Sequence, residues 1–259
     1  MEEEIRKILK MLEEGKINAE EAERLINALE ERRSKIKNID SLGKIIGESV
    51  SSALSIVPSI LESVFTPSSK EIREKIEWNK DELLEISLSG GDLDIKTEEN
   101  TNEINIEGKG KFHLEEGKIK LAGGDFSITL PSDLKKLRIL VSAGDLDGSV
   151  SCEKIEIILN AGDVDLNISC DDLNGVVNMG DMDIKFLKSP KNATLNCNMG
   201  DLSINLPENY NGTIIPHISL GDLSISKEGY RFKDKKYVFG NEEESKIEIF
   251  CKMGDVSIN

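Results

Sequence analysis

The chain has 259 residues, a formal net charge of -16 at pH 7 and a pI near 4.7, and only 4% of its residues are aromatic. That length accommodates one large or two ordinary domains with a sizeable core. So acidic a chain repels phosphate backbones and anionic lipid headgroups, and we therefore expect no nucleic-acid partner.

The first thirty or so residues carry a helix signal twice. Ile5, Ile8, Leu9 and Leu12 have helical spacing, and Gly15 supplies the residue that favours a helix end. Asn18 and Glu21 then form a capping-box pattern before a second apolar stripe, which contains Ala22, Leu25, Ile26 and Leu29. The pattern predicts a helical hairpin in residues 1–33, too small to be very stable alone, whose apolar face meets a second copy or a partner.

Residues 34–81 are predicted to contain an amphipathic helix followed by a linker. In residues 39–65 the apolar side chains keep a three-four spacing, and the opposite face is mostly Ser and Gly. Either the helix packs on the C-terminal domain or on copies of itself, or it lies in a membrane interface. The contact residues predicted for a membrane or partner are Leu42, Ile46, Val50, Leu54, Val57, Leu61 and Phe65. Residues 66–81 resemble a polar linker with at most a short helical turn.

A Gly-Asp pair recurs throughout residues 82–259. Its glycines stand at positions 91, 124, 144, 162, 180, 200, 221 and 254, with gaps of 33, 20, 18, 18, 20, 21 and 33 residues. Repeats of this length are typical of a stacked array in which each unit contacts its neighbours.

On both sides of each Gly-Asp pair, apolar and polar residues alternate as in a half-buried strand, and the alternation slips by one residue at the pair. Glycine allows the backbone to turn there, and Asp can accept a hydrogen bond from a nearby backbone N–H. We therefore expect a mainly β protein whose residues 82–259 form a parallel β-solenoid with one corner per coil. A β-sandwich is the alternative. The longer gaps at the two ends predict hairpin insertions that cap the stack.

The repeated carboxylates are the first candidate site. The corner aspartates are Asp92, Asp125, Asp145, Asp163, Asp181, Asp201, Asp222 and Asp255, and a second Asp follows two residues later at Asp94, Asp147, Asp165 and Asp183. Stacked carboxylates need water, hydrogen bonds or a cation between them. We favour a structural corner. The alternative is a calcium ladder of Asp145, Asp147, Asp163, Asp165, Asp181 and Asp183, although Ser replaces the second Asp in several repeats.

The chain lacks the residue patterns of an enzyme or a structural zinc site. Its two histidines, His113 and His217, fall in different repeats and accompany no nucleophile or nucleotide-binding motif. The cysteines Cys152, Cys170, Cys197 and Cys251 lack zinc spacing, and we expect reduced thiols. A disulfide between Cys152 and Cys170 is the alternative, because both lie eight residues after a repeat glycine in neighbouring coils. We expect no cofactor and no catalysis.

The recurrent Gly-Asp corner over residues 82–259 resembles a bacterial domain of unknown function that carries the name "putative adhesin". The segment ILKMLEEGKINAEEAERLINAL is similar to the SHOCT-like helical hairpin that often precedes that domain. The resemblance implies a non-catalytic protein linked to the cell envelope or to envelope stress, and it carries over no catalytic or ligand residues.

These observations together favour a binding or scaffolding protein of the bacterial cell envelope. It would use protein partners, or self-association, through its N-terminal helices, with peripheral membrane contact as a further expectation. A purely structural homo-oligomer assembled through the same helices is the alternative. The N-terminal Met1-Glu2-Glu3-Glu4 does not resemble a signal peptide, so we expect a cytoplasmic or peripherally membrane-associated protein.

Overall fold

The computed structural model describes residues 70–115, 117–241 and 244–259. The predicted helical hairpin of residues 1–33 and the predicted amphipathic helix of residues 39–65 lie outside the described residues, as do its contact residues from Leu42 to Phe65. None of the described residues belongs to a helix of the length and apolar character that a membrane span requires.

The described residues form 19 strands in two sheets, and most neighbouring strands are parallel. In spatial order, sheet A contains β1 (Lys70–Glu77), β4 (Glu103–Glu115), β6 (Phe126–Pro131), β3 (Leu93–Glu98), β8 (Leu146–Leu159), β9 (Val164–Ser169), β11 (Met182–Phe186), β13 (Leu202–Asn205), β19 (Val256–Ile258) and β15 (Leu223–Ile225). Sheet B contains β4, β5 (Lys118–Ala122), β2 (Leu83–Leu88), β7 (Leu134–Val141), β8, β10 (Asp172–Val177), β12 (Asn192–Cys197), β18 (Lys246–Met253), β14 (Gly212–Leu220), β17 (Lys236–Phe239) and β16 (Tyr230–Lys233). The long strands β4 and β8 bend from one sheet into the other.

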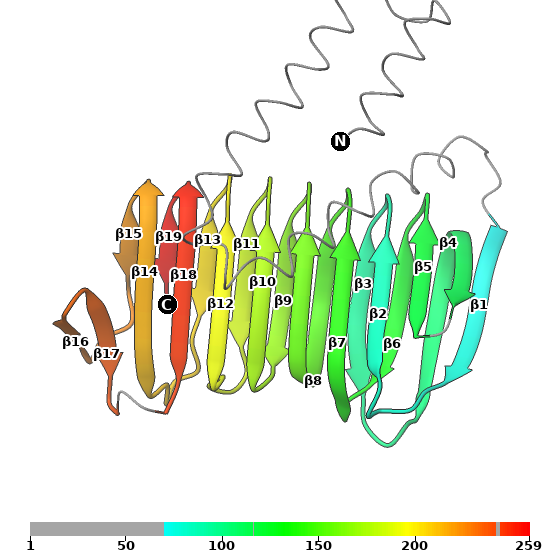
Figure 1. Cartoon of the computed structure of the whole chain (residues 1–259), viewed down its shortest axis with the longest axis horizontal. Coiled ribbons are helices and arrows are strands. Elements are labelled where there is room, and N and C mark those ends of the chain that lie inside the picture. The colour runs from blue at the N-terminus through cyan, green and yellow to red at the C-terminus, as the bar shows by residue number, and fades with distance from the viewer. Residues whose placement is uncertain (1–69, 116, 242–243) are drawn as a thin grey trace, which may run out of the picture. The chain divides into compact units, whose positions relative to one another are not determined.

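Each coil runs along sheet B, turns at a Gly-Asp pair and returns along sheet A, and Figure 1 shows the coils side by side in the β domain. The mainly β prediction is confirmed, and the pairing is that of a two-sheeted parallel solenoid. Parallel pairing between successive coils excludes the β-sandwich alternative, whose sheets are antiparallel.

The order of the coils differs from the order of the chain at both ends of the stack. The coil β2–β3 lies inside the coil β5–β6, because β7 returns to pair with β2. At the other end, β18–β19 inserts between β12–β13 and β14–β15. The last strands of the chain are therefore interior strands, as the red arrows in Figure 1 show. The two gaps of 33 residues in the repeat contain the additional strands, β4 in the first gap and β16 and β17 in the second.

Antiparallel strands cover the two ends of the stack. At one end β4 pairs with both β5 and β6, and β1 pairs with the outer edge of β4. At the other end β17 and β16 form a hairpin on β14. The predicted capping insertions are thus present. They extend both sheets at the first end and sheet B at the second end, where β15 is the outermost described strand of sheet A.

The linker predicted for residues 66–81 is wrong for residues 70–77, which form β1. Ile72 and Ile76 are four residues apart, a spacing that suits a helix turn, but alternate residues of a strand also share a face. Ile72 is buried and Ile76 packs against the core, opposite Gly108 and Ile104 of β4. The strand therefore belongs to the β domain.

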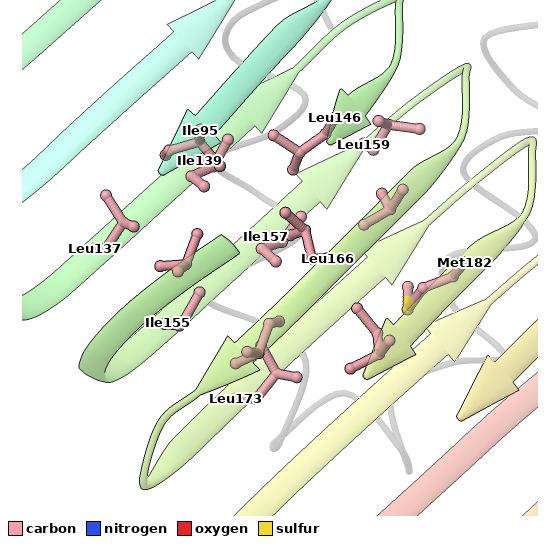
Figure 2. Packing of buried hydrophobic residues seen from close by; sticks show 14 of the residues in the cluster. Ile95, Leu137, Ile139, Leu146, Ile155, Ile157, Leu159, Leu166, Leu173 and Met182 are labelled. Carbon is pink, nitrogen blue, oxygen red and sulfur yellow. The ribbon is translucent and has the colours of Figure 1, made fainter. Parts of the chain in front are cut away.

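The core is a thin layer of aliphatic side chains enclosed between the two sheets. Figure 2 shows Ile139, Ile157 and Leu159 of sheet B facing Ile95, Leu146 and Leu166 of sheet A. Neighbouring coils place like residues opposite each other, for example Ile139 against Ile157. Because the coils repeat this arrangement, the core is continuous along the stack and holds every corner in the same orientation.

Candidate functional site

The corner glycines sit where no other residue fits. Seven of them have φ between +104° and +143°, a region that L residues rarely adopt. A Cβ added to Gly180 would lie 1.9 Å from the carbonyl oxygen of Gly162 in the neighbouring coil. At the Gly124 corner, which lies at one end of the stack, the preceding residue Gly123 takes the positive φ in place of Gly124. Glycine thus permits both the turn and the close approach of the coils.

The corner aspartates link each coil to the next. The backbone N–H of Asp163 donates to Oδ1 of Asp145 at 2.9 Å, and the N–H of Asp181 donates to Oδ1 of Asp163 at 2.8 Å. Seven such bonds, from 2.7 to 3.3 Å, join all eight corners in the spatial order Asp125, Asp92, Asp145, Asp163, Asp181, Asp201, Asp255 and Asp222. The carboxylates therefore accept the amide N–H groups that the corner leaves outside the sheets. We call this series the corner row.

The second aspartates form a parallel row on the outward face of sheet A. Strand register places Ser127, Asp94, Asp147, Asp165, Asp183, Ser203, Ser257 and Ser224 next to one another. Four carboxylates are thus adjacent in the middle of the row. Burial, and then repulsion from Asp145, Asp165 and other neighbouring aspartates, raises the pKa of Asp147.

The two rows bring together all six residues of the predicted calcium ladder, Asp145, Asp147, Asp163, Asp165, Asp181 and Asp183. Their Oδ1 atoms in the corner row accept backbone N–H groups, which is the structural role that we favoured from the sequence. Within the described part of the chain, no group of three or more His, Cys, Asp or Glu side chains is arranged to hold a metal ion.

All four cysteines are buried free thiols. Burial raises the pKa of Cys152 to about 11 and that of Cys170 to about 12. The exchanged coil order brings a second pair together, because Cys197 of β12 lies directly opposite Cys251 of β18. Burial raises the pKa of Cys197 to about 12, so its thiol is protonated at neutral pH.

The two histidines lie on strands near opposite ends of the stack. His113 is exposed on β4, with Nε2 3.4 Å from a carboxylate oxygen of Glu115. His217 is exposed on β14, where its ring stacks on Phe250 at a centroid distance of 4.7 Å. Each histidine is therefore an exposed surface residue, His113 beside Glu115 and His217 against Phe250.

Two features of this edge go beyond the sequence-based predictions. The Asp was predicted to accept a nearby backbone N–H, and the structure shows that every donor in the corner row belongs to another coil. The residue before each corner glycine changes from Gly or Ala to Met or Leu along the stack, and this spatial order is known only from the strand pairing.

The described residues thus define a two-sheeted parallel solenoid with one hydrogen-bonded Gly-Asp edge. The sequence profile of the Toastrack DUF4097 family matches residues 59–259, and the chain belongs to this family. A SHOCT-like domain profile matches residues 3–34. The comparison with curated proteins gives no match.

Three solved structures are similar to the chain. A "putative cell adhesion protein" from Clostridium sporogenes is 14% identical with a TM-score of 0.46, covering 74% of this chain and 99% of that one. A "putative adhesin" from Bacteroides fragilis is 14% identical with a TM-score of 0.42, at the same coverages. A "putative adhesin" from Parabacteroides merdae is 11% identical with a TM-score of 0.34, covering 76% of this chain and 99% of that one.

Proposed function

We propose that the protein is a non-catalytic binding and scaffolding protein that works at the bacterial cell envelope. The observation that carries the proposal is the repeated edge, in which eight coils present the same acidic corner in register. A rigid, repetitive surface of this kind suits the binding of extended protein partners. Membership of the Toastrack family and the SHOCT-like match to residues 3–34 support this class.

The N-terminal segments would supply localisation and assembly in this proposal. The helix predicted for residues 39–65 has the Ser- and Gly-rich polar face of a helix that lies in a membrane interface. The chain would then be cytoplasmic or peripherally attached to the membrane. The SHOCT-like hairpin would bind a protein partner or a second copy.

Liposome flotation tests the membrane part of the proposal. The full-length protein is mixed with neutral or anionic vesicles beside a variant with Val50→Glu and Val57→Glu, which places charges on the predicted apolar face. Ser52→Glu with Ser59→Glu is the matched control, because it adds the same charges to the opposite face. We expect the control to float and the apolar-face variant to sink. Flotation of both variants, or of neither, would contradict the proposed membrane contact.

Light scattering separates scaffolding from the structural alternative. A fixed oligomer in the absence of lipid that is lost when residues 1–65 are removed would favour a purely structural homo-oligomer. A full-length monomer that binds protein partners would favour the binding role.

A further inference from the structure

The residue immediately before each corner glycine changes character along the stack. In spatial order this position holds Gly123, Gly90, Ala143, Ala161, Met179, Met199, Met253 and Leu220. The first four are small, and the last four are large and apolar. We call Met179, Met199, Met253 and Leu220 the methionine ridge.

The ridge side chains are exposed although their backbone is fixed. Met179, Met199 and Met253 are 49, 42 and 44% exposed, and Leu220 is 66% exposed. Their carbonyls accept hydrogen bonds from corner glycines of neighbouring coils, for example Gly180 N–H to Met199 O at 2.9 Å. Ridge residues make up four of the nine large apolar side chains that are exposed in the described part of the chain. Such clustering is typical of an interaction surface, because single exposed apolar residues are usually scattered.

The corner itself does not require these side chains. Gly90, Ala143 and Ala161 occupy the same position in coils that make the same corner hydrogen bonds. The fold therefore does not require methionine at these positions, and it does not explain why these apolar side chains are exposed to solvent.

A second apolar row, Leu140, Ile158 and Val176, lies on the outward face of sheet B. Leu140 and Ile158 are only 7 and 5% exposed, so that row offers little surface to a partner. The methionine ridge is the larger accessible apolar surface of the two.

Charge beside the ridge indicates what it would bind. Asp181, Asp201, Asp255 and Asp222 of the corner row lie two residues after the four ridge residues and are exposed. None of these four carboxylates forms an ion pair with a lysine or arginine of the described residues. A second copy would bring its own aspartates against them, and anionic lipid would be repelled, whereas a basic partner would be attracted.

The length of the ridge suits a short helix. Four coils at a strand spacing of about 4.8 Å give an apolar strip about 14 Å long, which a helix covers with about ten residues. Methionine side chains are unbranched and adapt to different apolar surfaces. We propose that the methionine ridge and the aspartates beside it form a docking surface for a basic amphipathic helix of a protein partner.

This proposal gives the partner class for the proposed binding role, but it rests on the solenoid and not on residues 39–65. The probe is a fluorescent 14-residue peptide with leucines on one helical face and lysines beside them, titrated into the full-length protein and followed by anisotropy. One control peptide replaces each lysine by glutamate, and another scrambles the sequence so that the leucine face is lost. We expect binding of the first peptide only.

The main variant replaces Met179, Met199 and Met253 by alanine, the residue that the chain itself uses at Ala143 and Ala161. The melting temperature should be unchanged, and the dissociation constant for the basic peptide should rise about ten-fold or more. Leu83→Ala with Leu187→Ala is the matched control, because both residues are exposed and apolar but lie outside the ridge. It should bind as the unchanged protein does.

A second variant separates charge from apolar contact. Asp181→Asn, Asp201→Asn and Asp255→Asn keep an oxygen that accepts the inter-coil N–H while removing the charges. Affinity should fall, and its dependence on salt should weaken. The proposal is overturned if the basic peptide does not bind at 100 μM, if the glutamate peptide binds equally well, or if the alanine and asparagine variants bind like the unchanged protein. Each result is independent of vesicle flotation.

Discussion

Seven of the corner glycines meet two separate constraints, a positive φ and the close approach of a carbonyl of the neighbouring coil. At seven of the eight corners the aspartate meets a third, because its carboxylate accepts an N–H from a neighbouring corner. The pair therefore both turns the chain and joins the coils.

Gly180→Ala should lower the free energy of unfolding by about 3 kcal/mol or more, since the new Cβ would combine backbone strain with overpacking against Gly162. Gly90→Ala is the control, because a Cβ there meets nothing within 4 Å. It should change the free energy by less than about 0.5 kcal/mol. Urea denaturation measures the free energy of unfolding of both variants. If Gly180→Ala lost as little free energy as is expected for Gly90→Ala, the corner would not require glycine.

Asp147→Ser should raise the free energy of unfolding at pH 7 by about 0.5 kcal/mol, because it removes a charge that lies between Asp94 and Asp165. The pKa of Asp147 is raised in the folded protein. The unchanged protein therefore gains stability as the pH falls through that raised pKa, and the gain is complete below the unfolded value. The advantage of the serine variant should accordingly disappear at about pH 3.

Asp183→Ser provides the comparison for Asp147→Ser, since Asp183 has one aspartate neighbour and one serine neighbour in its row. Its effect at pH 7 should be about half as large. Thermal unfolding at both pH values measures the two variants, and an advantage that persists at low pH would exclude charge repulsion as the cause.

At the scale of elements, the order of the strands is the feature that the sequence did not reveal. Glycine positions and alternating residues predicted the corners and the strands, because each depends on local spacing. The neighbour of each coil depends on pairing between similar repeats. Both β14 and β18 present mainly aliphatic residues on alternate positions, although Pro216 of β14 lies opposite Ile249 of β18. Ile72 and Ile76 were ambiguous for a related reason, since their spacing suits a helix as well as a strand.

The same ambiguity affected the candidate site. The sequence predicts that Asp145 and Asp163 accept a backbone N–H. The donors belong to neighbouring coils, so they can be identified only once the order of the coils is known. The pair Cys197 and Cys251 became neighbours only through the exchanged coil order.

Hydrogen exchange tests that exchanged order. The amides of β18 should be among the most slowly exchanging in the chain, because β18 has partners on both sides. Those of β15 and β16 should exchange faster, since each has one paired neighbour among the described strands. Mass spectrometry on peptides from residues 223–233 and 246–253 gives the comparison. Faster exchange in β18 than in β15 would place β18 at the end of the stack.

At the scale of the molecule, the chain has a net charge of -16, and the two aspartate rows place many of its negative charges close together. Repulsion among solvated charges is screened by salt, so NaCl from low concentration to about 0.5 M should raise the melting temperature by a few degrees. CaCl2 and choline chloride at matched ionic strength should act like NaCl, since screening does not depend on the identity of the cation. A shift confined to calcium would instead support the calcium ladder.

The crossing at each end also fixes how such a solenoid can change in length. The last strand, β19, lies between β13 and β15, and β2–β3 lies inside β5–β6. A further repeat that paired directly with β19 would find both neighbouring positions filled by β13 and β15. Duplication of the central coils around Gly162 and Gly180 would lengthen the rod and keep both crossed ends unchanged.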